Sequence, residues 1–385
     1  MARAVNPDVE AFARIKVAGI GGSGMNAVDF MVANKVSGVD FLAVNSDAQD
    51  LHHSTAGKKI HIGKNLTKGL GTGMNPEIGR QAAEETKTEI QEALKGADMV
   101  FVVCGLGGGT GTGASPIVAE IAKAQGALTV AVVTKPFSFE GAERARIADE
   151  GLERLNKAVD AVIVIPNDRL LGIIEKQTSF TDAFAMCDNV LRQAVQGISD
   201  LITMPGIINV DFADVRAILQ DAGSALIGIG GATGESRAVE AAKGAISSPL
   251  LDVSIDGAKG VLFSIAGGSD MAMWEVNEAA RVITEPIDKE AKVIFGAIHD
   301  ERLRKGEIKV TVIAASFPDR FVGINNGGGA PAPRFNPPPQ AAPSSPVRPS
   351  APLSSSRPPL PSRNTEEEAE TNEWDSIPAF LRRKK

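Results

Sequence analysis

The sequence predicts an α/β protein in which a doubly wound parallel sheet is followed by a long helix, a second and smaller α/β domain, and a disordered C-terminal tail. Three observations lead to this fold. Between residues 15 and 167, short runs rich in Val, Ile and Ala alternate with helix-like stretches, as expected of parallel strands buried on both faces. A long amphipathic helical pattern follows, and beyond residue 317 the chain becomes rich in Pro, Ala and Ser.

Composition limits the classes of function. A chain of 385 residues is too long for one ordinary domain, and 43% hydrophobic with 23% charged residues permits a substantial core. The net charge of −7 disfavours nucleic-acid binding, because such proteins usually present a basic surface to phosphates. The sequence shows no apolar segment typical of a signal peptide or of a membrane span, so we expect a cytoplasmic protein that other molecules must hold at any membrane.

The cysteines and histidines indicate no redox or zinc chemistry. Cys104 and Cys187 are far apart inside apolar segments, which leaves neither a disulfide framework nor a Cys-x-x-Cys metal site and favours a reducing compartment. The histidines are not spaced like zinc ligands. We expect all four at the surface: His52, His53, His61 and His299.

The elements of the first domain follow from the apolar runs. Its strands are predicted at residues 15–20, 40–45, 99–105, 128–134 and 161–166. Its helices are predicted at residues 27–36, 75–94, 115–125 and 143–155. Sheets of this kind bind ligands at the carboxyl ends of their strands, so the chemistry should lie in the loops that lead into the helices.

The second half of the chain repeats this alternation on a smaller scale. The long helix runs from Thr181 to about Thr203, where Pro205 and Gly206 end it. Strands are then predicted at 224–230, 261–267, 292–298 and 309–315, with helices at 237–248 and 270–283. We therefore divide the chain into a first domain of residues 1–180, a central helix of 181–204, a second domain of 205–317, a linker of 318–370 and a terminal peptide of 371–385.

The linker and the terminal peptide differ in composition. The Pro-rich linker has too few large apolar residues to offset the entropy of ordering, so we expect it to be disordered and semi-extended. The terminal peptide instead carries an apolar cluster of Trp374, Ile377, Phe380 and Leu381. We interpret it as a short docking peptide that orders on a partner, although a frayed end with stray apolar residues is the alternative.

The first glycine-rich loop permits two interpretations. Gly19 to Gly24, read as GIGGSG, follows a strand and precedes a helix, which is the G-x-G-x-x-G pattern of a Rossmann dinucleotide site. Asp40 or Asp47 would then supply the ribose carboxylate. On this loop alone a nicotinamide- or flavin-dependent oxidoreductase remains open.

A second loop favours a triphosphate. The segment from Gly105 to Pro116, GLGGGTGTGASP, contains bare N–H groups and the hydroxyls of Thr110 and Thr112, ahead of a helix whose first turn should contain Pro116. A third glycine-rich stretch covers residues 69–76. Since no Walker motif supplies a lysine, backbone amides and Mg²⁺ bridging the phosphate oxygens would have to balance the charge.

GGGTGTG closely resembles the signature loop shared by FtsZ and the tubulins. Its neighbours resemble the FtsZ family in particular, over residues 12–317 and the tail: AVNSDAQDL, TKPFSFEG, PNDRLL, DNVLRQAVQGISDLI, NVDFADV and IPAFLRR. The resemblance implies a tubulin/FtsZ-like fold and a GTPase that uses Mg²⁺, with a monovalent cation also possible. It further implies head-to-tail filaments of the chain with itself in the mid-cell division ring, and membrane-anchoring partners such as FtsA-like proteins bound through residues 371–385.

The resemblance also implies roles for individual residues. Those around the phosphates would be Gly21, Gly22, Asn26, Gly71, Thr72, Gly73, Gly107, Gly108, Gly109, Thr110 and Gly111. Glu140 and Arg144 would meet the ribose, Phe184 would lie against guanine, and Asn167 and Asp188 would hydrogen-bond its edge. From the sequence alone, Phe184 would be a core residue and Asp188 a solvated helix residue.

The segment NVDFADV carries the catalysis that the resemblance implies. Asp211 and Asp214 lie three apart at the start of a helical stretch, where sequence alone would favour capping and complementing the helix dipole. In the FtsZ family this loop enters the nucleotide pocket of the next subunit, where the two carboxylates orient the attacking water and Asn209 completes the site. A purely structural filament without turnover is the alternative.

Overall fold

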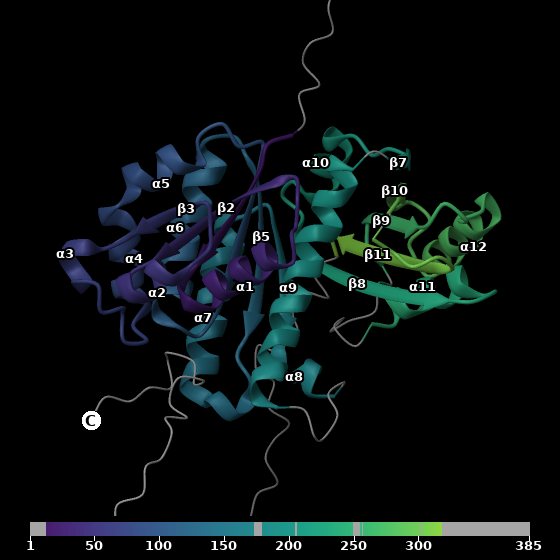
Figure 1. Cartoon of the computed structure of the whole chain (residues 1–385). Helices are drawn as coiled ribbons and strands as arrows, with labels where there is room; N and C mark the ends of the chain where they lie inside the picture. The colour runs from purple at the N-terminus through teal and green to yellow at the C-terminus, as the bar shows by residue number, and fades with distance from the viewer. Residues whose placement is uncertain are drawn as a thin grey trace, which may run out of the picture. The chain divides into compact units, whose positions relative to one another are not determined.

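Eleven strands of the described residues form one sheet in the order β3-β2-β1-β4-β5-β6-β8-β11-β9-β10-β7 (Figure 1). The computed structural model describes residues 13–172, 179–204, 206–248, 255, 257–300 and 302–317. The predicted α/β class with a largely parallel first sheet is confirmed. The predicted linker of residues 318–370 and the terminal peptide of 371–385 lie outside the described residues.

The strands follow the apolar runs closely. Their bounds are β1 Ile15–Ile20, β2 Val39–Asn45, β3 Lys58–His61, β4 Met99–Gly105, β5 Leu128–Lys135, β6 Ala161–Pro166, β7 Gly206–Ile208, β8 Gly223–Thr233, β9 Gly260–Gly267, β10 Lys292–His299 and β11 Glu307–Ala315. The sequence does not predict the short strands β3 and β7, because runs of three or four residues show no clear periodicity.

The helices between the strands are more numerous than predicted. Their bounds are α1 Gly21–Ala33, α2 Ala48–His53, α3 Lys64–Thr67, α4 Pro76–Glu85, α5 Lys87–Leu94, α6 Gly109–Ala124, the 3₁₀ turn η1 Ser138–Glu140, α7 Ala142–Ala158, α8 Asn167–Leu171, α9 Phe180–Thr203, α10 Phe212–Leu219, α11 Arg237–Ile246 and α12 Met273–Thr284. No helix among these described residues is long and apolar enough to cross a lipid bilayer.

Three helix predictions need correction. The helices α1 and α6 each begin six residues earlier than predicted, at Gly21 and Gly109, so the glycine loops themselves form the first helical turns. Pro116 therefore lies inside α6 and not in its first turn. The stretch predicted as one helix at 75–94 is two helices separated at Thr86, whose hydroxyl bonds to Ala82 O and accepts from the amide of residue 63.

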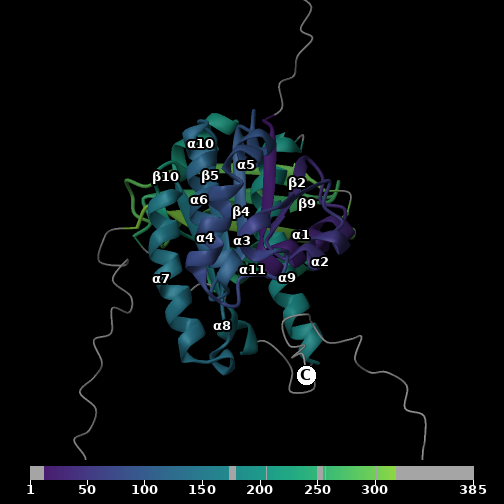
Figure 2. The ribbon, with the colours of Figure 1, turned by 90° about the vertical axis from the view of Figure 1, so that its left-hand side faces the viewer.

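The first half of the sheet is buried between two helical layers. Along β4, Met99, Phe101 and Val103 pack into one core with α1 and α9, while the alternate residues pack into a second core with α4, α5, α6 and α7. Figures 1 and 2 show these layers on the two sides of the sheet. The arrangement explains why the strands are apolar throughout and not alternating.

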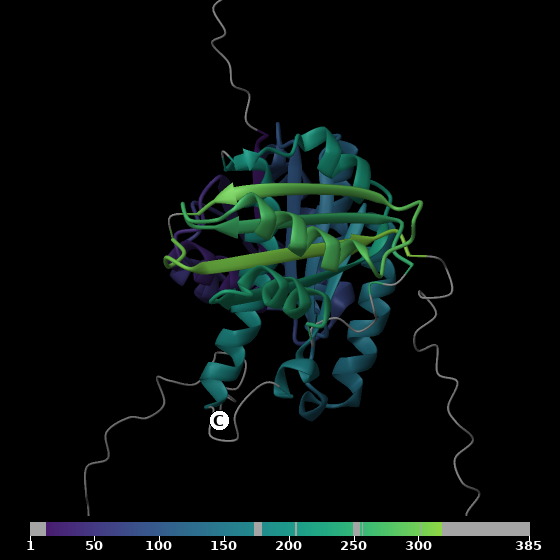
Figure 3. The same cartoon turned by 90° about the vertical axis from the view of Figure 1, so that its right-hand side faces the viewer.

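The two halves of the sheet meet at one short strand pairing. Ala161–Ile163 of β6 pair in parallel with Gly223–Ala225 of β8, and β11 then runs antiparallel to both β8 and β9. The strands of the second half run across those of the first half in Figures 1 and 3. A third core forms between these strands and the helices α11 and α12.

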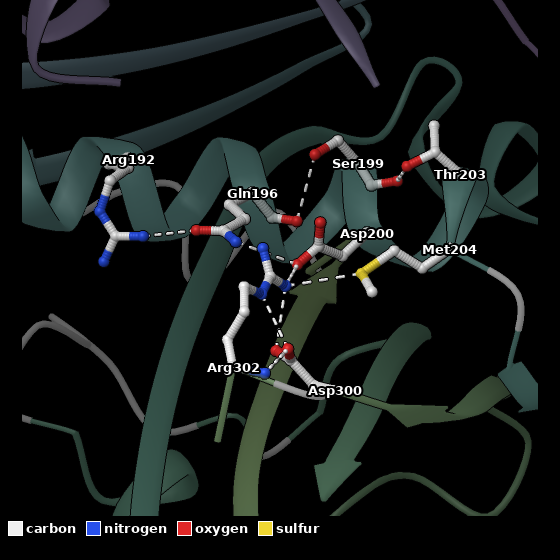
Figure 4. A network of polar contacts seen from close by, with 8 residues as sticks. All are labelled: Arg192, Gln196, Ser199, Asp200, Thr203, Met204, Asp300 and Arg302. Carbon is white, nitrogen blue, oxygen red and sulfur yellow. Dashed lines mark hydrogen bonds and ion pairs between the residues drawn. The ribbon is translucent and has the colours of Figure 1, made fainter. Parts of the chain in front are cut away.

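A polar network attaches the long helix α9 to the turn between β10 and β11 (Figure 4). Arg302 places its guanidinium 2.7 Å from Asp200 Oδ2 on α9 and 2.7 Å from Asp300 Oδ1. Gln196 donates to Asp200 Oδ2 at 3.2 Å and accepts from Arg192. Because both carboxylates are largely buried, this network holds the second half of the sheet against the helix.

Candidate functional site

The glycine-rich loops gather at the carboxyl edge of the first half of the sheet. Parallel register places Ile20 at the end of β1 beside Val44 of β2 and Cys104 of β4. The loops that follow these three strands therefore leave the sheet side by side. The fold thus brings together segments that are 84 residues apart in the chain, from Ile20 to Cys104.

Two of these loops present helix N-termini suited to an anion. The helices α1 and α6 have no side-chain cap and no acidic residue in the first turn. Every other described helix of eight or more residues has an acidic residue there. Uncapped amides and the positive end of the helix dipole favour negative charge, so this pair of helices forms a candidate phosphate site.

Some of the glycines are required by packing. A Cβ on Gly21 would lie 2.8 Å from Gly111 N, and one on Gly109 would lie 2.2 Å from Thr72 Oγ1. A Cβ on Gly107, whose φ is +91°, would lie 2.7 Å from Arg144 O. These glycines let three loops and the start of α7 approach one another at backbone distance.

Other glycines face open space. A Cβ on Gly73 or Gly108 would meet no atom within 4 Å, and one on Gly22 would meet only Asp50 Oδ2 at 3.8 Å. Packing does not require glycine at these three positions. They are where a ligand could approach the bare backbone, together with Gly71, whose Cβ would meet only Asp47 Oδ2 at 3.9 Å.

A buried cluster of hydroxyl groups connects three loops beside the glycines. Ser46 Oγ lies 2.7 Å from Thr110 Oγ1, and Thr72 Oγ1 lies 3.2 Å from the same atom. Ser46 was not among the predicted site residues, although its position directly after β2 was the available signal. The carbonyl of Ser46 also lies 3.2 Å from His61 Nε2, and His61 is half-buried behind this loop, whereas the other three histidines are exposed.

The residues predicted to meet the ribose lie in contact with each other. Arg144 Nη1 is 3.2 Å from Glu140 Oε2, and Glu140 Oε1 accepts from the amide of Phe137 at 2.8 Å. The Phe137 ring meets the ring of Phe184 edge-on, with centroids 5.4 Å apart. Phe137 therefore links the β5–α7 loop to the predicted guanine-binding face of α9.

Two polar side chains near this face are largely withdrawn from water. Asp188 lies one turn after Phe184 on α9, and burial raises the pKa of its carboxyl from 3.8 to about 7. Asn167 begins α8 at the carboxyl end of β6, and its Oδ1 is buried without a hydrogen bond among the described residues. A buried acceptor without a donor costs about 1–3 kcal/mol, so this pair fits a ligand that supplies N–H groups.

The predicted catalytic residues lie at the opposite edge of the sheet. Asp211 caps α10 by accepting from Ala213 N at 3.1 Å, and Asp214 is exposed in the first turn. Two residues after Asp214, Arg216 donates to Asp98 O and Gly126 O, which lie just before β4 and β5. Figure 1 shows α10 at this end and α8, which follows β6, at the other.

The separation of the two sets of residues follows from strand length. The seven residues of β4 span roughly 20 Å, at about 3.3 Å per residue, between the amino edge near α10 and the glycine loop. No side chain covers such a distance. The described chain thus brings the predicted phosphate, ribose and guanine residues to one edge and leaves Asn209, Asp211 and Asp214 at the other.

Known proteins resemble this chain over both halves of the sheet. Residues 14–175 match the model of the Tubulin/FtsZ family, GTPase domain, and residues 223–318 match that of the FtsZ family, C-terminal domain. An empty FtsZ dimer of M. jannaschii is similar at 48% identity with a TM-score of 0.75, covering 79% of this chain and 88% of that chain. A point mutant of the same FtsZ gives 47% identity and a TM-score of 0.77, covering 80% and 92%.

A more distant structure shares the fold alone. CetZ2 from Haloferax volcanii, solved as a GTPγS-bound protofilament, is 24% identical with a TM-score of 0.68 and covers 78% of this chain and 92% of that chain.

Proposed function

This chain belongs to the tubulin/FtsZ family and is a GTPase, and from that premise we propose that it polymerises head to tail into the division ring at the future septum. One observation carries the proposal. The uncapped glycine-rich helices and the exposed carboxylates of α10 lie at opposite edges of one sheet. Such a division suits a site completed by two subunits, and a contact between unlike edges continues into an open filament. The family match also excludes the oxidoreductase interpretation of the first loop.

In this proposal the first edge binds GTP. The amides of α1 and α6 hold the phosphates against the open glycines, with Asn26 exposed further along α1 and Gly71 to Gly73 nearest the γ-phosphate. Glu140 and Arg144 meet the ribose. At this part of the site the phosphates meet mainly bare backbone, and few charged side chains surround them.

Guanine selectivity rests on two acceptors. Ionised Asp188 accepts from two adjacent guanine N–H groups, and the buried Asn167 Oδ1 accepts another hydrogen bond at the purine edge. Adenine lacks this donor pair and would leave the carboxylate buried without a partner. Phe184 packs against the base.

Mg²⁺ would balance the phosphate charge. No group of three or more His, Cys, Asp or Glu side chains in the described part of the chain could hold a metal by itself. The hydroxyls of Ser46, Thr72 and Thr110 and the carboxylate of Asp47 are nevertheless the hard oxygen donors that Mg²⁺ accepts, directly or through water. When bound with GTP the ion supplies positive charge to the phosphoryl oxygens, and a monovalent cation could bind nearby.

The opposite edge of the next subunit would complete hydrolysis. Asp211 and Asp214 accept hydrogen bonds from the attacking water and orient it toward the γ-phosphorus, while Asn209 shapes the loop by accepting from the amide of Gly206 at 2.7 Å. Turnover should then rise steeply with protein concentration, because neither edge works alone.

A mixing experiment tests this division. Gly108→Asp places an acid in open space at the phosphate site, so the variant should fold but lose GTP binding, whereas Asp211→Ala should keep binding and assembly but lose turnover. Each variant alone should be inactive. The mixture should recover part of the wild-type rate, because one subunit supplies the loops and the other the carboxylates.

The matched control for the first variant is Gly57→Asp, at an exposed glycine with comparable open space. It should leave GTP binding and turnover unchanged. A mixture that co-sediments with GTP yet stays inactive would contradict hydrolysis in trans.

We also propose that residues 371–385 recruit a membrane-anchoring, FtsA-like protein. Removal of residues 375–385 should abolish that binding and spare assembly, as measured by pull-down and by light scattering with GTP beside GDP. Undiminished recruitment by the truncated chain would contradict it.

A further inference from the structure

The helix α10, whose N-terminus carries Asp211 and Asp214, is held to the first half of the sheet although the strands before and after it belong to the second half. The chain enters α10 from β7, which pairs with β10, and leaves it for β8, which pairs with β11 along most of its length. Two sets of contacts nevertheless connect this segment to loops of the first half. We call them the Arg216 anchor and the Lys123 anchor.

The Arg216 anchor lies on the helix itself. Arg216 Nη2 donates to Asp98 O and to Gly126 O, both at 3.3 Å. Asp98 O also accepts from Leu128 N at 2.9 Å, so it belongs to the start of the ladder between β4 and β5. The guanidinium carbon lies 5.2 Å from the centre of the Phe212 ring, one turn earlier on α10, and this contact restricts the arginine side chain. One side chain thus connects α10 to the starts of two central strands.

The Lys123 anchor follows the helix. Lys123, near the end of α6, places Nζ 2.9 Å from Asp160 Oδ1 and 3.0 Å from Asp221 Oδ1. Asp160 is 4% exposed, and its second carboxylate oxygen accepts from Thr129 N at 2.9 Å. The carbonyl of Asp160 accepts from the amide of Gly223 at 2.9 Å. Because the buried carboxylate has fixed partners, the turn after α10 is also tied to the first half.

Both anchors end on the strands that carry the candidate GTP loops. Asp98, Gly126 and Asp160 lie just before β4, β5 and β6, which pair with one another in parallel. The carboxyl ends of the same three strands lead to the phosphate loop, to the loop of Glu140 and to Asn167. Buried strands are closely packed and deform little. The position of α10 relative to the GTP edge of its own chain is therefore set by the length of these strands.

The placement of α10 matters because its carboxylates act at a contact between subunits. Asp211 and Asp214 are exposed, and the backbone of the helix determines where they lie. A misplacement of reacting groups by about 1 Å can cost about 100-fold in rate. Any rotation of α10 would shift both carboxylates against the attacking water.

We propose that Arg216 and Lys123 are positioning residues for GTP hydrolysis, which hold α10 so that Asp211 and Asp214 meet the nucleotide of the next subunit in one orientation. This inference rests on the hydrolysis in trans proposed above. The anchors lie at the edge opposite to the GTP loops, so their loss should slow the chemical step and leave GTP binding intact. A purely structural role would instead lower stability and leave the turnover of assembled subunits unchanged.

Arg216→Met tests the first anchor. Methionine preserves much of the side-chain length and the apolar contact with Phe212, but it donates no hydrogen bond. GTP turnover per sedimented subunit should fall about tenfold, while the affinity of the unassembled protein for GTP should stay within about twofold. Phosphate release and sedimentation are measured together at several protein concentrations, which separates loss of turnover from loss of assembly.

Conservative variants separate positioning from folding. Arg216→Lys retains a cation that can donate to one of the two carbonyls, so it should recover about a third of the wild-type turnover. Asp221→Asn weakens the Lys123 anchor but leaves Asp160 paired, and asparagine tolerates the left-handed backbone at this position, where φ is +51°. It should lower turnover about threefold, and about thirtyfold together with Arg216→Met. The matched control is Arg281→Met, at an exposed arginine whose ion pair with Glu278 stays within α12, and it should change nothing.

A mixing experiment distinguishes this inference from the proposed function. Gly108→Asp subunits should not bind GTP but have an intact α10, so adding them to Arg216→Met should raise turnover above that of Arg216→Met alone. Adding Asp211→Ala subunits should not, because both partners then present faulty carboxylates.

The outcomes lead to different conclusions. If Gly108→Asp fails to activate even Asp211→Ala, hydrolysis in trans is wrong and the positioning role is overturned with it. If that pair is active but Arg216→Met turns over GTP at the wild-type rate per sedimented subunit, only the positioning role is overturned. A lower thermal unfolding temperature of Arg216→Met without lower turnover per sedimented subunit would likewise assign Arg216 to stability alone.

Discussion

Replacing Asp188 by Asn should stabilise the nucleotide-free protein while destroying GTP binding. Burial raises the pKa of the Asp188 carboxyl from 3.8 to about 7, so the folded protein holds an ion that would be more stable in water. At about 1.4 kcal/mol per pKa unit, the difference amounts to about 4 kcal/mol at pH above 7. Asparagine is similar in shape and does not ionise.

The sign of this effect depends on pH. Below about pH 4 the carboxyl is protonated in both the folded and the unfolded chain, and the substitution should change the free energy of unfolding little. Between pH 4 and 7 the unfolded chain releases the proton while the folded chain retains it, so the advantage of Asp188→Asn grows with pH. Above pH 7 it should stay constant at about 4 kcal/mol, measured by urea denaturation of nucleotide-free protein.

The GTP affinity of the wild type should also increase with pH, because binding requires the ionised carboxyl. Only the carboxylate accepts from both guanine N–H groups, so Asp188→Asn should lose about 100-fold or more in affinity, the equivalent of one or two charged hydrogen bonds. For the wild type, a pKa of about 7 predicts affinity about tenfold weaker at pH 6 than at pH 8. Glu153→Gln on the exposed face of α7 is the control and should alter neither quantity. A destabilised Asp188→Asn variant at pH 8, or a wild-type affinity that is flat between pH 6 and 8, would refute this reasoning.

Three further predictions concern other parts of the structure. Gly109→Ala should abolish folding or GTP binding because its methyl would meet Thr72 Oγ1 at 2.2 Å, whereas Gly108→Ala should leave stability within about 1 kcal/mol, as measured by thermal unfolding. Asp211→Ser should keep the helix cap, and with it stability within about 1 kcal/mol, yet lose GTP turnover like Asp211→Ala; turnover retained by the serine variant would show that only the cap matters. Arg302→Met should cost about 2–3 kcal/mol of unfolding free energy by leaving Asp200 and Asp300 largely buried without their cation, and adding Asp200→Asn should recover part of the loss.

Local sequence patterns predict much of the fold. The strands at residues 15–20, 99–105 and 161–166 coincide with the observed β1, β4 and β6, because a strand buried on both faces must be apolar throughout. Helix ends at glycine loops were less predictable. Gly109 to Ala114 form the first turns of α6 where α4 packs against them, and a single sequence does not report that contact.

The site was predictable in kind but not in detail. The resemblance of GGGTGTG indicated where phosphates should bind, yet it did not distinguish Gly109, which is needed for packing, from Gly108, which faces open space. Nor did it indicate Ser46, whose hydroxyl meets Thr110 across 64 residues of chain. Whether a side chain at a given glycine position would clash or find free space depends on neighbouring residues that are distant in sequence.

The sequence by itself determined the order of the longer strands and helices, the glycine loops and the family. These depend on local periodicity and on residue types that only certain backbone conformations or ligands require. Only the tertiary structure decided that the phosphate loops and the carboxylates of α10 lie at opposite edges, and that burial raises the pKa of the half-buried Asp188. Distances and burial arise when the parallel register brings remote segments together, and no local pattern encodes them.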